Sequence, residues 1–120
     1  MSKKILVVDD EADIRRFLTA VLEKHDYETV TAEDGVKALE IARKEKPDLI
    51  ILDLMMPNET GTGFYRKLSR DKDLSETPVI VVSGLAGRDL AVRKPVAVFD
   101  KPIDPDEFIA TVDKTLGGSD

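Results

Sequence analysis

Acidic, hydroxyl and amine side chains directly follow short apolar runs in this 120-residue chain. The residues at these run ends are Asp9 and Asp10, Asp53, Ser83, and Asp100 with Lys101. Carboxylate oxygens are hard ligands that suit Mg²⁺, which typically binds one or two carboxylates together with waters and a phosphate. A carboxylate beside such a phosphate can act as a nucleophile and form an aspartyl phosphate. These residue types therefore suit metal-assisted phosphoryl transfer, provided that the fold brings them together.

The apolar runs themselves predict the elements that would do this. The runs 5–8, 49–52, 79–82 and 96–99 are continuous rather than alternating, and most of their residues are β-branched. Such runs are typical of strands that are buried on both faces of a parallel sheet. The run 27–31 alternates instead, which suits an edge strand.

Helical patterns lie between the predicted strands. We expect four helices whose apolar residues recur at helical spacing and point inward. The inward residues of the first are Ile14, Phe17, Leu18, Val21 and Leu22, and those of the second, over 34–43 and capped by Asp34, are Val36, Leu39 and Ala42. The third follows Gly61 with Phe64 and Leu68 inward, and the last has Phe108, Ile109, Val112 and Leu116 inward. The last helix has a strong start signal in Asp104-Pro105 with Glu107, and Gly117-Gly118 ends it.

Strands that alternate with helices predict an open parallel α/β sheet with helices on both faces. In such sheets ligands bind beyond the carboxyl ends of the strands, which is where the polar residues collect. Two carboxylates about 4 Å apart repel by roughly 4 kcal/mol at an effective dielectric constant near 20. Lys101 offsets only part of this negative charge, so a divalent cation is the expected ligand.

Composition excludes several other classes of site. The chain has no cysteine and one histidine, His25, so disulfides, cysteine zinc sites and sites that need two imidazoles are excluded. The net charge of −6 argues against direct binding of nucleic acid. No apolar run approaches the ~20 residues of a membrane span, and the N-terminus does not resemble a signal peptide. We expect one cytoplasmic domain over residues 1–120, with its core at 3–116 and a tail or the start of a linker at 117–120.

The motifs resemble those of the receiver domains of two-component response regulators. The resemblance extends over residues 3–116 and is carried by Ile5-Leu6-Val7-Val8-Asp9-Asp10-Glu11, by Leu49-Ile50-Ile51-Leu52-Asp53-Leu54-Met55-Met56-Pro57 with Gly61, by Pro78-Val79-Ile80-Val81-Val82-Ser83-Gly84, and by Lys101-Pro102. It implies a flavodoxin-like, doubly wound, five-stranded parallel sheet with the strand order 2-1-3-4-5.

The resemblance also implies a role for each motif residue. Asp53 resembles the phosphoacceptor. Mg²⁺, or Mn²⁺ in its place, would be bound by Asp10 and Asp53, by the backbone carbonyl of Met55, and through water by Asp9. Ser83 and Lys101 would contact the phosphoryl group. Gly61 would allow the turn after the active-site loop, and the peptide bond before Pro102 is commonly cis in the family.

Such a domain takes a phosphoryl group from a histidine kinase or a phosphotransfer protein and catalyses that transfer itself, so it is not a turnover enzyme on an external substrate. Phosphorylation would switch a surface for a downstream protein or a second copy. In the family this surface is formed by the fourth helix, the fifth strand and the fifth helix, here the segments 88–94, 96–99 and 105–116.

Two positions depart from the family pattern. The switch position that often holds Tyr or Phe is Val98 here, and the adjacent Phe99 should point to the opposite face of its strand. The segment from Ser83 to Lys101 is about one helical turn shorter than usual. Within it, the connection from Gly84 to Pro95 is close to the minimum for a parallel crossover, so we expect the fourth helix to be short, irregular or mobile.

Simpler interpretations remain open for the same residues. Asp9 and Asp10 could cap the first helix, Ser83 could be an ordinary strand-end hydroxyl, Lys101 a solvated lysine, and His25 a residue at the C-terminal end of a helix. Two other functions are a phosphatase similar to the haloacid dehalogenases and a receiver-like module that is not phosphorylated. The phosphatase would need a second aspartate where Met55 stands. A flavodoxin-like nucleotide-binding domain would need a glycine-rich loop after the first strand.

Overall fold

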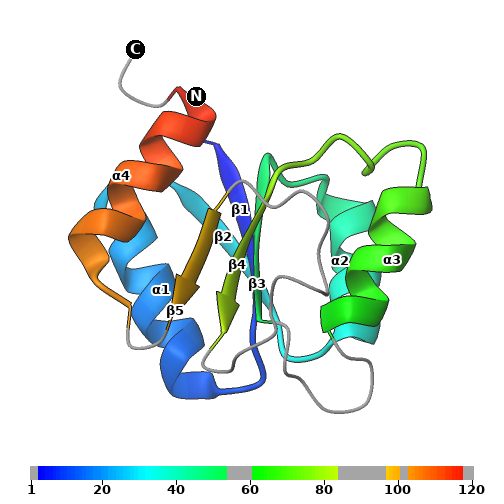
Figure 1. Ribbon diagram of the computed structural model, residues 1–120, viewed down its shortest axis with the longest axis horizontal. Helices are drawn as coiled ribbons and strands as arrows, with labels where there is room; N and C mark the ends of the chain where they lie inside the picture. The colour runs from blue at the N-terminus through cyan, green and yellow to red at the C-terminus, as the bar shows by residue number, and fades with distance from the viewer. Residues whose placement is uncertain (1–2, 54–60, 84–96, 101–102, 118–120) are drawn as a thin grey trace.

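A computed structural model describes residues 3–53, 61–83, 97–100 and 103–117 and confirms the alternation of strands and helices. In chain order the elements are β1 (Lys4–Val8), α1 (Ala12–Lys24), β2 (Glu28–Ala32), α2 (Gly35–Glu45), β3 (Leu49–Asp53), α3 (Gly61–Arg70), β4 (Val79–Ser83), β5 (Ala97–Asp100) and α4 (Pro105–Leu116). The strands form one parallel sheet in the order β2-β1-β3-β4-β5, so the alternating strand β2 lies at an edge as expected (Figure 1). Within these described segments, no helix is long and apolar enough to cross a membrane.

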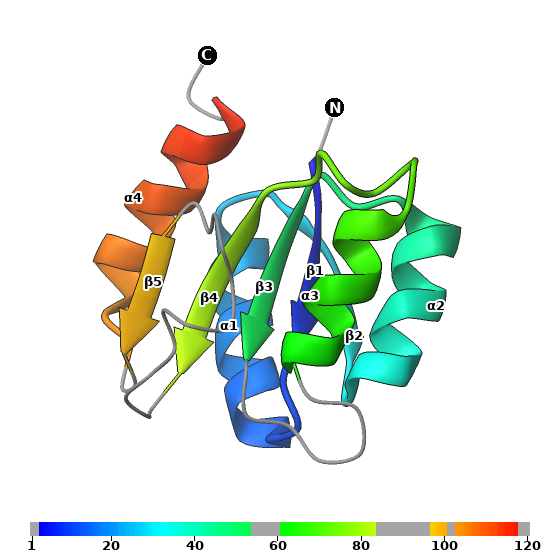
Figure 2. The ribbon, with the colours of Figure 1, turned by 45° about the vertical axis from the view of Figure 1, so that its right-hand side comes forward.

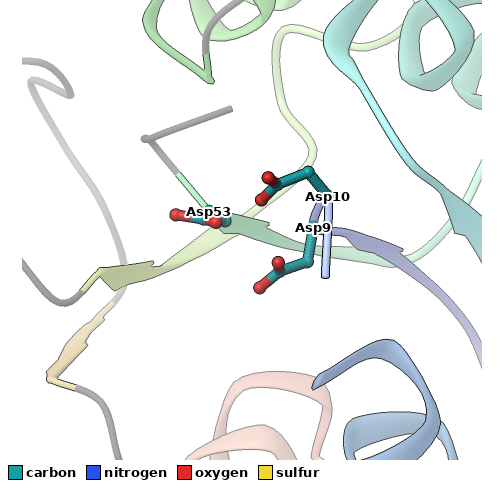
Figure 3. Close-up of side chains that lie close together, drawn as sticks. All are labelled: Asp9, Asp10 and Asp53. Carbon is teal, nitrogen blue, oxygen red and sulfur yellow. The ribbon is translucent and has the colours of Figure 1, made fainter. Parts of the chain in front are cut away.

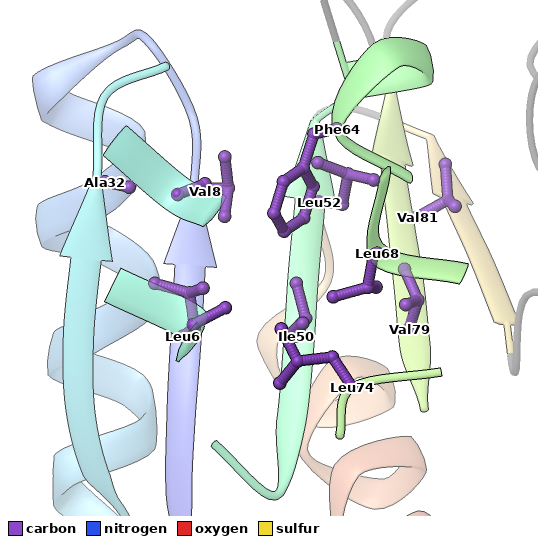
Figure 4. Packing of buried hydrophobic residues seen from close by; sticks show 12 residues of the cluster. Leu6, Val8, Ala32, Ile50, Leu52, Phe64, Leu68, Leu74, Val79 and Val81 are labelled. Atoms are coloured by element: carbon purple, nitrogen blue, oxygen red, sulfur yellow. The ribbon is translucent and has the colours of Figure 1, made fainter. Parts of the chain in front are cut away.

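Helices cover both faces of the sheet, as predicted. Helices α1 and α4 lie on one face, and α2 and α3 lie on the other (Figures 1 and 2). The two helix pairs pack over two separate apolar clusters, because successive residues of a strand point to opposite faces. Leu6 and Val8 of β1 belong to the α2/α3 cluster, which Figure 4 shows, whereas Ile5 and Val7 belong to the α1/α4 cluster.

The central strands are buried on both sides, which explains their continuous apolar runs. Every residue of β3 is buried, including Asp53 at its end. β3 lies between β1 and β4, where Val8 pairs with Leu52 and Asp53 pairs with Val82. The strands therefore run in register, and their carboxyl ends reach the same edge of the sheet.

Caps confirm the predicted starts of two helices and the predicted end of the last one, whereas α2 runs two residues beyond the predicted end, to Glu45. The Asp34 carboxylate accepts a hydrogen bond from the backbone N–H of Lys37 at the start of α2. Asp104 accepts from the N–H of Asp106 at 2.9 Å and more weakly from that of Glu107 at 3.4 Å. Gly117 ends α4 with φ of 63°, a left-handed conformation in which glycine avoids a steric cost.

Two predicted inward residues are exposed instead. Val36 is 50% exposed, and Phe17 is 38% exposed. In α2 the buried residues are the small Gly35, Ala38 and Ala42, which bring the helix backbone close to the sheet. Val36 lies about 200° around the helix from Ala38 and therefore points away. In α1 the buried stripe is centred on Leu18 and Leu22, which leaves Phe17 on its flank.

The predicted fourth helix, over 88–94, lies outside the described residues. The structure's α4 corresponds to the fifth helix of the sequence prediction. Its packing over the sheet rests on Phe108, Ile109 and Val112, which are buried in the α1/α4 cluster.

A buried phenol connects α4 to the segment before β2. Tyr27 is 8% exposed, and its hydroxyl donates a hydrogen bond to the Asp113 carboxylate of α4. Burial, and secondarily the hydrogen bond to Asp113, raises the pKa of the Tyr27 phenol well above its ordinary value. The folded state therefore holds this proton more tightly than the unfolded state does, so the stabilisation is fully present below pH ~10 and is lost as pH rises above it.

We expect Tyr27→Phe to lower the free energy of unfolding by about 1 kcal/mol at pH 7, because a buried hydrogen bond is lost. The difference in the free energy of unfolding between wild type and variant should shrink to near zero by about pH 11. Above pH ~10 the unfolded wild type releases the proton of this phenol, which destabilises the folded wild type but not the variant. Urea unfolding at both pH values tests this. A difference that stays constant with pH would contradict the account.

Candidate metal and phosphoacceptor site

Three carboxylates meet at the carboxyl edge of the sheet. Asp9 and Asp10 directly follow β1, and Asp53 is the last residue of β3. Each offers an oxygen atom, and these atoms all lie within 4.8 Å of one another. In Figure 3, Asp9 and Asp10 extend their carboxylates toward the side on which Asp53 lies. The prediction that these residues come together is therefore confirmed.

The sheet register accounts for this meeting. Val8 pairs with Leu52, so the next residues along the two strands, Asp9 and Asp53, come side by side. Both are almost fully buried, with exposures of 1% and 3%, whereas Asp10 is exposed. The site therefore has a buried acidic floor and one acidic residue on its solvent side.

The turn from β1 into α1 is held by hydrogen bonds around Asp9. Its backbone N–H donates to the carbonyl of Ala32 at the end of β2, at 3.2 Å. Its side-chain Oδ1 accepts from the backbone N–H of Glu11 at 2.9 Å. Its own carbonyl oxygen accepts from the guanidinium of Arg15 at 2.6 Å. The backbone that carries the two acidic residues is thus tied both to the sheet and to α1.

The alternative that Asp9 and Asp10 simply cap the first helix does not describe this turn. Helix α1 begins at Ala12, and its N-cap residue is Glu11. The Asp9 carboxylate bonds to the N–H of that N-cap residue, in the turn before the helix. Asp10 lies one residue outside the N-cap and faces the other carboxylates.

The donor set fits a small, hard cation such as Mg²⁺. All three donors are carboxylate oxygens, and Mg²⁺ binds oxygen ligands at 2.0–2.1 Å, so two oxygens on one ion lie at most ~4.2 Å apart. A spread of up to 4.8 Å needs only a small closure or one intervening water. In the absence of a cation, three like charges at this spacing repel one another.

The other sequence-predicted residues are placed only in part. Ser83 ends β4 and pairs with Asp100 at the end of β5, so both reach the same edge as Asp53. Val98 and Phe99 lie on β5 in register with Val81 and Val82, respectively. Gly61 is the first residue of α3, and the loop before it lies outside the described residues. His25 is the C-cap residue of α1, as expected. Met55, Lys101 and Pro102 lie outside the described residues.

One residue at the site was missed by the sequence interpretation. Arg15 is partly buried, and besides its bond to Asp9 it acts on Glu33 in the turn after β2. The Lys37 ammonium, which is hydrogen-bonded to Glu33, holds the pKa of that carboxyl below its ordinary value, and the Arg15 guanidinium adds a smaller effect in the same direction. No spacing signal identifies Arg15, because its partner at the site is a backbone carbonyl.

The comparisons with known proteins agree with this geometry. The family model for the response regulator receiver domain matches residues 5–113. Protein PilH of Pseudomonas aeruginosa is 34% identical over 122 residues, which cover 96% of this chain and 98% of PilH. The chemotaxis protein CheY4 of Vibrio cholerae superposes with a TM-score of 0.88 at 30% identity and covers 97% of this chain and all of CheY4.

A further solved structure is the receiver domain of the sensor histidine kinase PA1611 of Pseudomonas aeruginosa, which has a magnesium ion coordinated in its active site cleft. It covers 98% of this chain and 99% of its own, with a TM-score of 0.89. At 21% identity the likeness shows a shared fold alone.

We expect Asp10→Asn to weaken Mg²⁺ binding and to stabilise the metal-free protein by roughly 1 kcal/mol, because it removes one of three mutually repelling charges at an exposed position. Thermal melts in EDTA and with increasing Mg²⁺ test both parts. Glu76→Gln removes the same charge just before β4, at the opposite edge of the sheet, and is the matched control. A metal-free Asp10→Asn protein that melts below wild type would contradict the repulsion.

Proposed function

This chain belongs to the response regulator receiver domains, the receiving modules of two-component signalling, and from that premise we propose that Asp53 accepts a phosphoryl group in a Mg²⁺-dependent reaction. The donor is a sensor histidine kinase or a histidine phosphotransfer protein. Receiver domains are signalling proteins rather than turnover enzymes on external substrates. The phosphorylated and unphosphorylated forms of this chain are therefore two signalling states.

The observation that supports the proposal best is the buried Asp53 carboxylate beside Asp9 and Asp10. A carboxylate at the end of a fully buried strand is held in one place, which suits in-line attack on a phosphorus atom. The neighbouring acidic residues supply the cation ligands that a transferring phosphoryl group needs nearby.

The metal would be held by Asp10 and Asp53 directly, by the backbone carbonyl of Met55, and through water by Asp9. When bound, the cation neutralises charge on the phosphoryl oxygens, and Mn²⁺ can take the place of Mg²⁺. An Asp53 oxygen forms the new bond to phosphorus while the bond from phosphorus to the donor histidine nitrogen breaks. The imidazole leaves with that electron pair and takes up a proton from solvent. With acetyl phosphate as donor, acetate is the leaving group.

Residues from the neighbouring strand ends complete the proposed machinery. Lys101 would pair with a phosphoryl oxygen, and Ser83 would hydrogen-bond another. A shift of Ser83 toward the phosphoryl group would report phosphorylation to β5, where Val98 stands at the usual aromatic switch position and Phe99 beside it. The responding surface is the one formed by the predicted fourth helix, β5 and α4, and it would bind a downstream protein or a second copy of the chain.

A phosphatase of the haloacid dehalogenase type remains the second candidate for the same carboxylates. Such an enzyme needs a general acid two residues after its nucleophile, and Met55 at that position has no proton to give. The two candidates differ in turnover: a receiver retains one phosphoryl group for a time, whereas a phosphatase releases phosphate continuously from an ester substrate.

We expect acetyl phosphate to add one phosphoryl group to the wild-type chain in the presence of Mg²⁺ and none in EDTA, as read by intact mass. Asp53→Asn should stay unmodified under both conditions, because the nucleophilic oxygen of the carboxylate is replaced by an amide nitrogen. Asp73→Asn, an aspartate in the loop after α3, is the matched control and should be modified like wild type.

Two further results would contradict the proposal. Equal modification of wild type and Asp53→Asn would place the reaction elsewhere. Failure of the wild type to gain mass, together with failure to bind beryllofluoride and Mg²⁺, would indicate a receiver fold that serves only for binding. Continuous Mg²⁺-dependent hydrolysis of p-nitrophenyl phosphate would favour the phosphatase.

A further inference from the structure

Arg15 of α1 contacts the backbone of the turn that precedes its own helix. It lies in the first turns of α1, and its guanidinium reaches back six residues to the carbonyl oxygen of Asp9, at 2.6 Å. A hydrogen bond from a charged donor is shorter and stronger than one between neutral groups. The planar guanidinium is also preorganised, so it loses less conformational freedom per bond than a lysine ammonium does.

The oxygen that accepts this hydrogen bond belongs to the peptide that leads into Asp10. The Asp9 carbonyl belongs to the peptide plane that also contains the N–H of Asp10. A hydrogen bond that holds this oxygen in place also holds the peptide plane in place. The orientation of that plane determines the direction in which the Asp10 side chain leaves the backbone. The N–H of Asp9 is held by Ala32 and its side chain by the N–H of Glu11, so the bond from Arg15 holds the side of this turn that leads to Asp10.

We propose that Arg15 is a positioning residue for the metal site: its guanidinium orients the Asp9–Asp10 peptide so that the exposed Asp10 carboxylate faces Asp9 and Asp53 before a cation arrives. This inference rests on the proposed function, because it concerns the site through which that function would act. Arg15 itself contacts neither the cation nor the phosphoryl group in this role.

The charge of Arg15 makes the proposal sharply testable. A guanidinium close to the site repels a divalent cation, so removing its charge would by itself tighten Mg²⁺ binding. Loss of positioning acts in the opposite direction and weakens binding. Removing a residue that hydrogen-bonds to and orients a metal ligand typically lowers the metal affinity 10–100-fold. The sign of the change therefore separates positioning from a simple electrostatic effect.

The test is a calorimetric titration of the full chain with Mg²⁺ alone. We expect Arg15→Met, which keeps an apolar stem of similar length, to weaken binding by about tenfold. Arg15→Lys keeps the charge and one donor and should lose less. Arg16→Met is the matched control: it removes the same charge from the next position, where Arg16 pairs with the exposed Asp13, and it should leave the affinity unchanged or slightly tighter.

A second readout follows phosphorylation by acetyl phosphate as Mg²⁺ is increased. For Arg15→Met, the Mg²⁺ concentration that gives half the maximal rate should rise, while the rate at saturating Mg²⁺ stays near that of wild type. Urea unfolding shows whether each variant is folded. If Arg15→Met is unfolded, Arg15→Lys decides the question by its affinity for Mg²⁺.

The outcomes separate this inference from the proposed function. A wild type that binds Mg²⁺, together with a folded Arg15→Met that binds it equally or more tightly, would overturn the positioning role and leave the proposed function intact. If Arg15→Met is folded and binds Mg²⁺ more weakly than wild type, an Arg15→Lys variant with the affinity of wild type supports the positioning role. If Arg15→Met is unfolded, the same Arg15→Lys result overturns the positioning role. A wild type that does not bind Mg²⁺ overturns both.

Discussion

The double-sided burial of β3 is the constraint on which the rest of the molecule depends. All of its residues are buried, because helices cover both faces of the sheet and strands flank it on both edges. Its last residue is an aspartate, so the fold itself delivers a carboxylate to a position that is only 3% exposed. Removing a charge from water costs several kcal/mol unless other groups compensate it. A positive charge that binds at this edge of the sheet would therefore stabilise the buried carboxylate.

The alignment of β1 beside β3 adds further negative charge at the same edge of the sheet. Asp9 follows β1 in register with Asp53 and is buried as well, and Asp10 adds a third carboxylate from the solvent side. Strand register, rather than any local signal, brings these groups together from positions more than forty residues apart. A cation that binds here is therefore coupled to both strands, and its affinity depends on how rigidly the turn after β1 is held.

Much of this arrangement could be predicted from the sequence, because its causes are local. Continuous β-branched runs became buried strands, and Asp34, Asp104 and Gly117 became the caps their types favour. The inward faces of α1 and α2 were partly wrong, as Phe17 and Val36 show. Rotation of a helix against a sheet depends on which small residues allow close approach, and Ala38 and Ala42 decided this in α2. The periodicity of large residues alone does not contain that information.

Two side-chain contacts, one between Tyr27 and Asp113 and one between Arg15 and Asp9, could not be predicted from the sequence. Tyr27 and Asp113 are separated by 86 positions, and nothing in the sequence around either indicates the other. Arg15 appears in the sequence as one of many charged residues on a helix, and its partner is a backbone oxygen, which every residue possesses. The acidic site was predictable because its residues lie at or just after the ends of strands in a parallel sheet. The groups that hold the site in shape were not predictable.

The strand order also bears on how the protein is made. Because β1 lies between β2 and β3, residues up to Asp53 already contain three neighbouring strands of the sheet. During synthesis from the N-terminus, the outer edge of β3 stays unpaired until β4 leaves the ribosome, and an unpaired apolar strand edge is a template for association with other chains. While the segment between Asp53 and Val79 is being made, the apolar outer edge of β3 is therefore open to association with other chains.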